Sequence, residues 1–241
     1  MTPDLHRVSY GSQTIDFELR RASRKTMAIH VHPDMRVEVV APCAVELEKI
    51  YQRVLRRAKW IKAQQIFFEP FHPKALPRQY VSGETHRYLG RQLRLKIKGD
   101  LINKVTMSAG HLLVSSHYPR NTALTCELVT NWMKAHAHQK FKERLALCIQ
   151  RFPASEKFTP RGIIIRQLSN RWGSMTQAKR LVLNTKLIHT PLPCIDYVII
   201  HELCHMQHPN HSSKFWKLLA TVLPDWQKRK AQLEKHGSLV F

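Results

Sequence analysis

The sequence has 241 residues and a mass of 28.2 kDa, and 43% of its residues are apolar, enough for a hydrophobic core in one large domain or two small ones. No run approaches the roughly eighteen apolar residues of a transmembrane helix, and residues 1–20 lack the apolar segment of a signal peptide, so we expect a cytoplasmic protein without a membrane partner. Lys and Arg number 39 against 17 Asp and Glu, and the net charge of +22 favours anionic partners, such as nucleic acid or a nucleotide, without selecting one.

The first predicted elements are strands and a helix. The pattern is strand-like from Val8 to Val40, and its clearest part, TMAIHV followed by MRVEVV, predicts a β-hairpin that turns at residues 32–34. From Ala44 to Phe67 apolar residues recur every three or four positions, which predicts an amphipathic helix. Its basic side chains are typical of a solvated helix face, with a concentrated binding patch as the second interpretation; they are Arg53, Arg56, Arg57, Lys59 and Lys62.

A long connection follows this helix. Residues 69–86, EPFHPKALPRQYVSGETH, carry three prolines and a Ser-Gly pair, a composition typical of loops. We therefore expect an N-terminal region of hairpin and helix over residues 1–79 and a second domain over residues 80–241.

The second region begins with short strands near 87–98 and 104–115. Asn121 is a candidate N-cap for a long helix that runs to about Phe152. The apolar line expected to face the core of this helix is Leu124, Leu128, Trp132, Ala135, Phe141 and Leu145.

Strands and helices then alternate to the end of the sequence. The run GIIIRQ predicts a buried strand and RLVLNTKL its partner, with the polar SNRWGSMTQAK as a connection between them. Thr190-Pro191 is expected to cap and open a helix, and the apolar residues Tyr197–Ile200 predict that this helix is central and buried. A last helical region starts at Ser212 or Ser213 and is interrupted at Pro224. No internal repeat is visible in the sequence, and the overall pattern predicts an α+β fold.

The stretch HELCHMQHPNH, from His201 to His211, is the strongest functional signal. The H-E-x-x-H pattern on a helix places His201 and His205 one turn apart on the same face, where both imidazoles can reach one metal ion. Glu202 is then close enough to act on a water molecule at that ion. Nitrogen ligands of this kind suit zinc.

The third ligand must come from His208 or His211. On a straight helix His208 would lie about 10 Å along the axis from His201, too far for a tetrahedral centre. Pro209 disfavours helical geometry at His208, and Asn210 tolerates a left-handed conformation, so we expect the helix to end there and His211 to turn back. We therefore predict a zinc site formed by His201, His205 and His211.

Three neutral ligands leave a fourth position for water, as in catalytic zinc sites. The expected chemistry is hydrolysis, with the zinc-bound water activated by Glu202 as general base. The cysteines are not expected to contribute, because they are scattered, never form a C-x-x-C pair, and are predicted to be buried thiols; they are Cys43, Cys126, Cys148, Cys194 and Cys204.

The region from residue 171 to residue 216 resembles the YgjP-like zinc metallopeptidases, which are related to the SprT-type and WLM-type proteases. The shared motifs are R-W-G-S at Arg171–Ser174, L-N at Leu183–Asn184, I-D-Y-V at Ile195–Val198, H-E-L-C-H at His201–His205 and N-H-S-x-x-F-W at Asn210–Trp216.

The resemblance implies a zincin-like catalytic domain over roughly residues 80–241, preceded by a small β-rich region and long helices. It implies His201, His205 and His211 as zinc ligands and Glu202 as the general base. In zincins the strand before the active-site helix aligns an extended substrate, which would place Leu181–Asn184 at the cleft. Arg171 and Trp172 either line this cleft or have a structural role.

The leading hypothesis is therefore a zinc-dependent peptidase that acts on a peptide or protein. Two alternatives remain open. The first is a metal-dependent hydrolase of nucleotide phosphoanhydrides, which the basic surface would suit. The second is a nucleic-acid-associated protein whose metal site is not catalytic.

Overall fold

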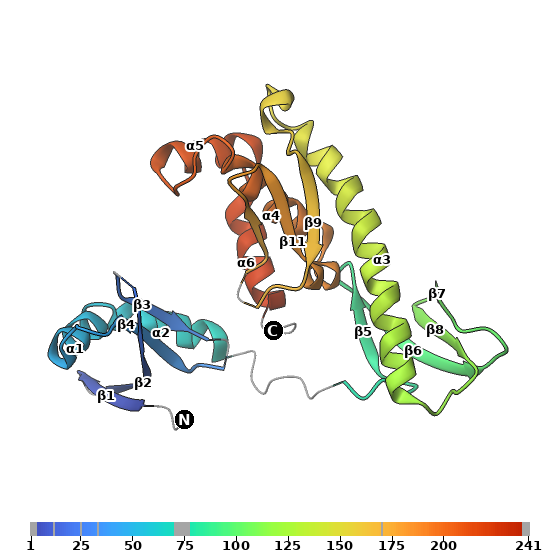
Figure 1. The fold of residues 1–241 in the computed structure, drawn as a ribbon, viewed down its shortest axis with the longest axis horizontal. Coiled ribbons are helices and arrows are strands. Elements are labelled where there is room, and N and C mark those ends of the chain that lie inside the picture. The colour runs from blue at the N-terminus through green and yellow to red at the C-terminus, as the bar shows by residue number, and fades with distance from the viewer. Residues whose placement is uncertain are drawn as a thin grey trace. The chain divides into compact units, whose positions relative to one another are not determined.

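The computed structural model describes residues 4–11, 13–24, 26–32, 34–69, 78–169 and 171–237 (Figure 1). They belong to two compact units, the first extending to residue 75 and the second starting at residue 76. No helix among these residues is long and apolar enough to cross a membrane.

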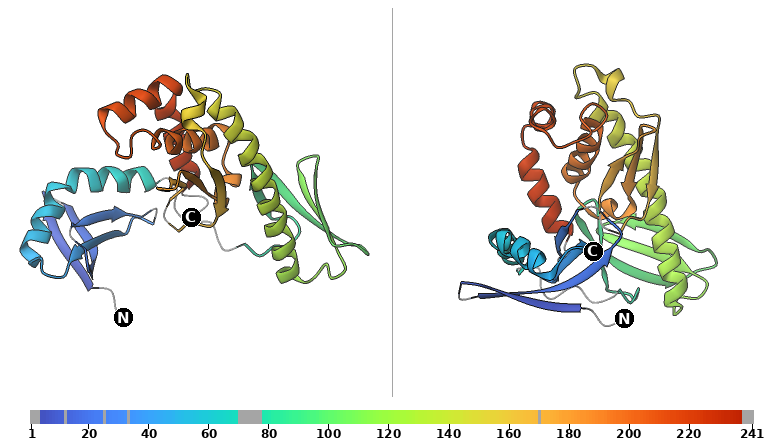
Figure 2. Two further views of the ribbon diagram at one scale, coloured as in Figure 1. Left: turned by 45° about the horizontal axis from the view of Figure 1, so that its top comes forward. Right: turned by 60° about the vertical axis from the view of Figure 1, so that its left-hand side comes forward.

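The first unit is a four-stranded sheet with helices on one face (Figure 2). The strands are β1 (Asp4–Tyr10), β2 (Gln13–Ala22), β3 (Ala28–Val31) and β4 (Val37–Pro42), in the order β1-β2-β4-β3. The predicted hairpin is confirmed, because β3 and β4 pair antiparallel, although Pro33 of its turn lies outside the described residues.

The predicted single helix over 44–67 is wrong, because it is divided into α1 (Leu47–Arg56) and α2 (Ala58–Phe68) at Arg57. The backbone tightens there, and the N–H of Arg57 donates to the carbonyl of Val54 at 3.0 Å. Both helices still bury one apolar side against the sheet, whereas other apolar residues, such as Leu55 and Ile66, are exposed. The helix residues in this core are Ile50, Val54, Ala58 and Ile61.

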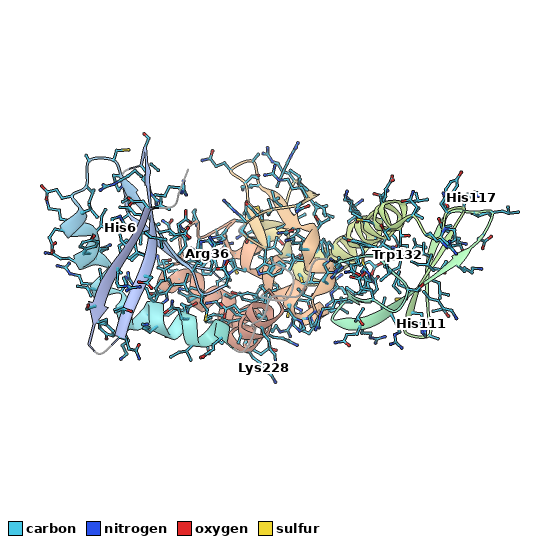
Figure 3. All side chains as sticks on the ribbon, turned by 90° about the horizontal axis from the view of Figure 1, so that it is seen from below. His6, Arg36, His111, His117, Trp132 and Lys228 are labelled. Atoms are coloured by element: carbon cyan, nitrogen blue, oxygen red, sulfur yellow. The ribbon has the colours of Figure 1, made fainter. Side chains whose placement is uncertain are left out.

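The second unit contains a sheet with the same connectivity. Its strands are β5 (Thr85–Tyr88), β6 (Arg91–Gly99), β7 (Lys104–Ser108) and β8 (His111–Ser116), in the order β5-β6-β8-β7. In both sheets two antiparallel hairpins are joined by a parallel central pair. The structure thus repeats a topology where the sequence shows no repeat. Figure 3 shows His111 and His117 near the two ends of β8.

The long helix α3 (Thr122–Ile149) has the predicted N-cap, because the Asn121 side chain accepts a hydrogen bond from the N–H of Leu124. The predicted apolar line is confirmed at Phe141, which is buried, and at Leu128, Trp132 and Leu145, which pack against the core, but it is wrong at Ala135, which is exposed. Helix α3 packs against β7 and β8 and also against the helix at Leu192–Cys204. These two contacts together determine which of its faces is buried. The residues that it buries are Thr125, Val129, Met133, Ala137, Phe141 and Cys148.

A second, smaller sheet lies beside α3 (Figure 1). Its strands are β9 (Gly162–Arg166), β10 (Gly173–Met175) and β11 (Arg180–Asn184), in the order β10-β11-β9. The two predicted strands, β9 and β11, pair in parallel. The intervening polar segment is more than a connection, since it contains β10, which pairs antiparallel with β11.

The remaining helices are α4 (Leu192–Cys204), α5 (Ser213–Val222) and α6 (Trp226–Gly237), and 3₁₀ turns lie at Ser155–Phe158 and Thr185–His189. The prediction of a buried central helix is confirmed for α4, since Tyr197–Ile200 are all buried. The predicted cap is displaced by one residue: Pro191 is the N-cap, and the Thr190 hydroxyl donates to the carbonyl of Leu187 instead. Ser212 caps α5, and the helix break before α6 occurs at Leu223–Asp225, as predicted.

The start of α4 rests on the turn between β5 and β6. Leu89 and Gly90 have φ values of 49° and 81°, as a type I′ hairpin turn requires. A Cβ atom on Gly90 would lie 2.7 Å from Cγ of Pro191. The turn between β7 and β8 has the same conformation at Ala109 and Gly110, but nothing lies within 4 Å of a Cβ there.

We expect Gly90→Ala to lower the free energy of unfolding by about 2–4 kcal/mol, because left-handed strain of about 1 kcal/mol is added to an overlap with Pro191. Urea denaturation measures the loss. Gly110→Ala is the matched control and should lose only about 1 kcal/mol, from the strain alone. Equal losses in the two variants would contradict the close contact with Pro191.

Candidate metal centre

Three imidazoles converge beyond the end of α4. His201 lies in the last turn of this helix, His205 is its C-cap, and His211 belongs to the loop before α5. One nitrogen of each side chain lies within 4.8 Å of the other two, and the Nε2 atoms of His201 and His211 are 3.1 Å apart. Among the described residues this is the one cluster of three or more His, Cys, Asp or Glu side chains with metal-ligand spacing.

The chain turns back toward the helix within six residues. Helix α4 ends at Cys204, earlier than the predicted end at His208, and the N–H groups of Met206 and Gln207 close tighter turns onto the last carbonyls of the helix. Asn210 is not in the left-handed conformation that we expected. The turn is instead closed by a hydrogen bond from the N–H of Ser212 to the carbonyl of Asn210 at 2.8 Å.

His208 contributes its backbone to this site. Its ring is not part of the cluster, but its carbonyl accepts a hydrogen bond from Nδ1 of His205 at 3.0 Å. This bond places the His205 proton on Nδ1 and leaves Nε2 free to bind a metal. The arrangement therefore places His211, and not His208, in position to be the third ligand.

Two aromatic residues of α5 support the cluster, and the sequence reasoning assigned them no role. Phe215 is fully buried, and its ring centroid lies 5.0, 4.7 and 4.8 Å from those of His201, His205 and His211. Trp216 stacks on His211 and donates its indole N–H to the carbonyl of that residue at 3.1 Å. The F-W pair at the end of the N-H-S-x-x-F-W motif was the signal that could have predicted this contact.

The charge state of the histidines suits metal binding. Burial lowers the pKa of His201 to about 3, with further lowering from His205, His211 and Lys230. Burial, together with His205 and Lys230, also lowers the pKa of His211. Both imidazoles are therefore neutral near pH 7, the form in which histidine binds a metal.

The donor set fits zinc. It consists of three nitrogens and no carboxylate, a combination that favours zinc over magnesium or calcium. The 3.1 Å between two Nε2 atoms is close to the separation of about 3.3 Å expected for two nitrogens on a tetrahedral zinc ion. All three ligand nitrogens lie within 4.8 Å of one another. Nδ1 of His201 is buried without a hydrogen-bond partner, so packing against Tyr197 and Phe215 holds this ring instead.

Glu202 lies beside the histidines and is 7% exposed. Burial raises its pKa to about 7, against opposing effects of a hydrogen bond with the backbone of Met175 and the charge of Arg171. A carboxyl group with this pKa exchanges protons readily at neutral pH.

Strand β10 packs directly on this glutamate. A Cβ atom on Gly173 would lie 3.0 Å from Cγ of Glu202 and 3.0 Å from Cγ1 of Val198. The absence of a side chain at Gly173 therefore allows the strand to approach α4. Asn184 fixes the preceding segment, since its side-chain amide donates to the carbonyls of Leu168 and Arg171 at 2.9 Å each.

The three histidines, Glu202 and Gly173 line a cleft of about 820 Å³ between β10, α4 and α6. Arg171 and Trp172 are among its lining residues. The expectation that Leu181–Asn184 borders the cleft is wrong, because β11 is the central strand and is paired on both sides. Among the strands that the structure describes, β10 pairs with β11 alone.

The cysteines are all free and none belongs to the cluster. Cys148, Cys194 and Cys204 are buried as predicted, whereas Cys43 is exposed and Cys126 is half-buried, so the prediction of buried thiols is wrong for these two.

Comparison with known protein families gives a match over most of the chain. The family model described as YgjP-like, metallopeptidase domain, matches residues 25–236 of the chain. No curated protein matches the chain.

We expect His201→Ala, His205→Ala and His211→Ala each to weaken zinc binding by more than about 100-fold, because each removes one of three nitrogen donors. Zinc titration with a chromogenic chelator as competitor measures the affinities. His208→Ala is the matched control and should bind zinc as the unmodified chain does, because only its backbone carbonyl is used. Loss of zinc from His208→Ala but not from His211→Ala would show that the assignment is wrong.

Proposed function

The chain belongs to the YgjP-like metallopeptidase family, and on this basis we propose that it is a zinc-dependent peptidase in which Glu202 is the general base. The observation that supports this assignment most is the position of a buried carboxyl group, with a pKa near 7, in the same cleft as three convergent imidazoles. Family membership supports a metal-dependent peptidase, and the roles of the individual residues are our proposal.

His201, His205 and His211 would hold the ion. When bound, zinc supplies Lewis-acid chemistry, since it polarises a carbonyl group and lowers the pKa of water. Glu202 would accept a proton from the attacking water and then donate it to the amine that leaves. The burial of Glu202 favours both steps. With a pKa raised to about 7, the carboxyl group can be either ionised or protonated near pH 7, and so can both accept and donate a proton.

The unpaired edge of β10 is suited to an extended peptide. The strand lies against Glu202 and lines the cleft, and its backbone groups on the side away from β11 pair with no strand among the described residues. A substrate that adds to this edge as a further strand would place its backbone next to the carboxylate. The same features, a helix with H-E-x-x-H beside an edge strand, support our assignment of the second unit as zincin-like.

Hydrolysis of a phosphoanhydride is the second candidate activity. Three cationic side chains line the cleft, those of Arg171, Lys179 and Lys230. The lining also contains two acidic side chains, those of Glu202 and Glu234. Cationic side chains around a metal centre also suit an anionic nucleotide. Incubation with denatured protein and, separately, with nucleoside triphosphates distinguishes the two activities.

We expect Glu202→Gln to reduce hydrolysis by about 10²–10⁴-fold, because the amide cannot accept the proton of water. Zinc content should stay unchanged, since the three nitrogen donors remain in place. Initial rates on a denatured protein substrate and metal analysis of the same preparation measure both effects.

The control for this variant is Glu234→Gln, which removes a second carboxylate from the lining of the same cleft. It should retain its activity within a few-fold. If Glu202→Gln cleaves the substrate as fast as Glu234→Gln does, Glu202 is not the base.

Gly173→Ala tests how closely β10 must approach Glu202. The added Cβ overlaps Cγ of Glu202 and Cγ1 of Val198, so we expect hydrolysis to fall about tenfold or more while zinc stays bound. Gly162→Ala, in β9 of the same sheet, is the matched control because nothing lies within 4 Å of its added Cβ. Equal activity of the two variants would argue against this requirement.

A further inference from the structure

The first unit has a groove of its own, of about 370 Å³, where α1 meets α2 above β3. Strand β3 is an edge strand of the described sheet, and the helices leave Ile29 of this strand and Met27, which precedes it, only partly covered. These two residues line the groove together with Arg53, Arg57 and Trp60. The groove therefore combines apolar side chains with two guanidinium groups and one indole ring.

The arginines of this groove differ from those on the opposite face of the same sheet. There, cross-strand ion pairs neutralise the basic side chains; the pairs are Arg7–Asp16, Arg20–Glu38 and Arg36–Glu18. Arg53 and Arg57 have no ion pair with any described residue, and no carboxylate lines the groove. The two arginines of the groove thus lack the carboxylate partners that these three arginines of the opposite face have.

Two further basic residues, Arg56 and Lys59, are exposed on the same helices and add to the positive charge there. Lys62, which the sequence grouped with them, is directed elsewhere, since its ammonium group donates to the carbonyl of Thr14 at 2.9 Å.

Trp60 is the aromatic residue of the groove and is 41% exposed. It makes no ring contact with the other aromatic side chains that the structure describes. The contrast with the second unit is clear, because Trp132 stacks on His136 and Trp216 stacks on Trp226. The Trp60 indole is therefore partly accessible to a planar ligand from the groove.

We propose that this groove binds single-stranded nucleic acid, with a base stacked on Trp60 and the adjacent phosphates held by Arg53 and Arg57. An aromatic ring flanked by cations is the arrangement that single strands use, because it contacts both the base face and the backbone. A duplex keeps its base faces stacked inside the helix and so cannot use the indole. An acidic peptide would satisfy the two arginines but leave the indole and the apolar side chains without a partner. The residues that line the groove belong to the first unit and none of them lines the cleft of the second unit, so the proposal does not rest on the proposed hydrolytic function.

The test is fluorescence anisotropy of a labelled oligothymidylate of about twelve nucleotides, titrated with the full chain at several salt concentrations. We expect Trp60→Ala to weaken binding about tenfold or more, and Trp60→Phe, which keeps a ring, to weaken it less. Arg53→Gln and Arg57→Gln should each weaken binding and reduce the slope of log affinity against log salt by about one.

Arg20→Gln is the matched control, because it removes one positive charge from the ion-paired face of the same unit. It should bind within about twofold of the unmodified chain. Three results would overturn the proposal: binding by Trp60→Ala as tight as that of the unmodified chain, an equal loss in Arg20→Gln, or equally tight binding of duplex DNA or polyglutamate. Circular dichroism of each variant shows whether the unit is still folded.

Discussion

The second unit depends on the pairing of one buried carboxylate. Asp196 lies in the middle of α4, the most deeply buried helix, and is 3% exposed. Arg144 of α3 donates to both of its oxygens at 2.7 Å, and Arg229 of α6 lies 3.5 Å away. A buried carboxylate without such partners would cost several kcal/mol, so the helices must pack where these guanidinium groups reach Asp196. This requirement fixes the position of α4 between α3 and α6.

A helix held in this way presents its last turn in a defined direction. Successive residues then face different partners: His201 packs against Phe215 of α5, while Glu202 packs against Gly173 of β10. The proposed ligand His201 and the proposed base Glu202 thus come from adjacent positions, yet their environments differ. Burial favours the neutral form of both side chains, which suits metal binding by one and proton transfer by the other.

The sequence predicted the parts of the site that depend on local geometry. The spacing of His201 and His205 follows from the helix period, and Pro209 indicated that the chain turns before His211. The support from Phe215 and Trp216 was not predictable in this way, because it depends on how α5 returns to α4. Strand β10 was missed for a related reason. A strand of three residues that includes one glycine is too short to show the alternation of apolar and polar residues, and it forms because it pairs with β11.

Charge shows a further limit of sequence reasoning. Composition establishes an excess of basic residues, but whether a given arginine is available to a ligand depends on pairing across strands, which composition does not contain. Arg20 and Arg53 look alike in the sequence, yet Arg20 is bound to Glu38 whereas Arg53 lines a groove that contains no carboxylate. A net charge of +22 is therefore compatible with many surfaces, and the distribution of the acidic partners decides which of them can attract an anion.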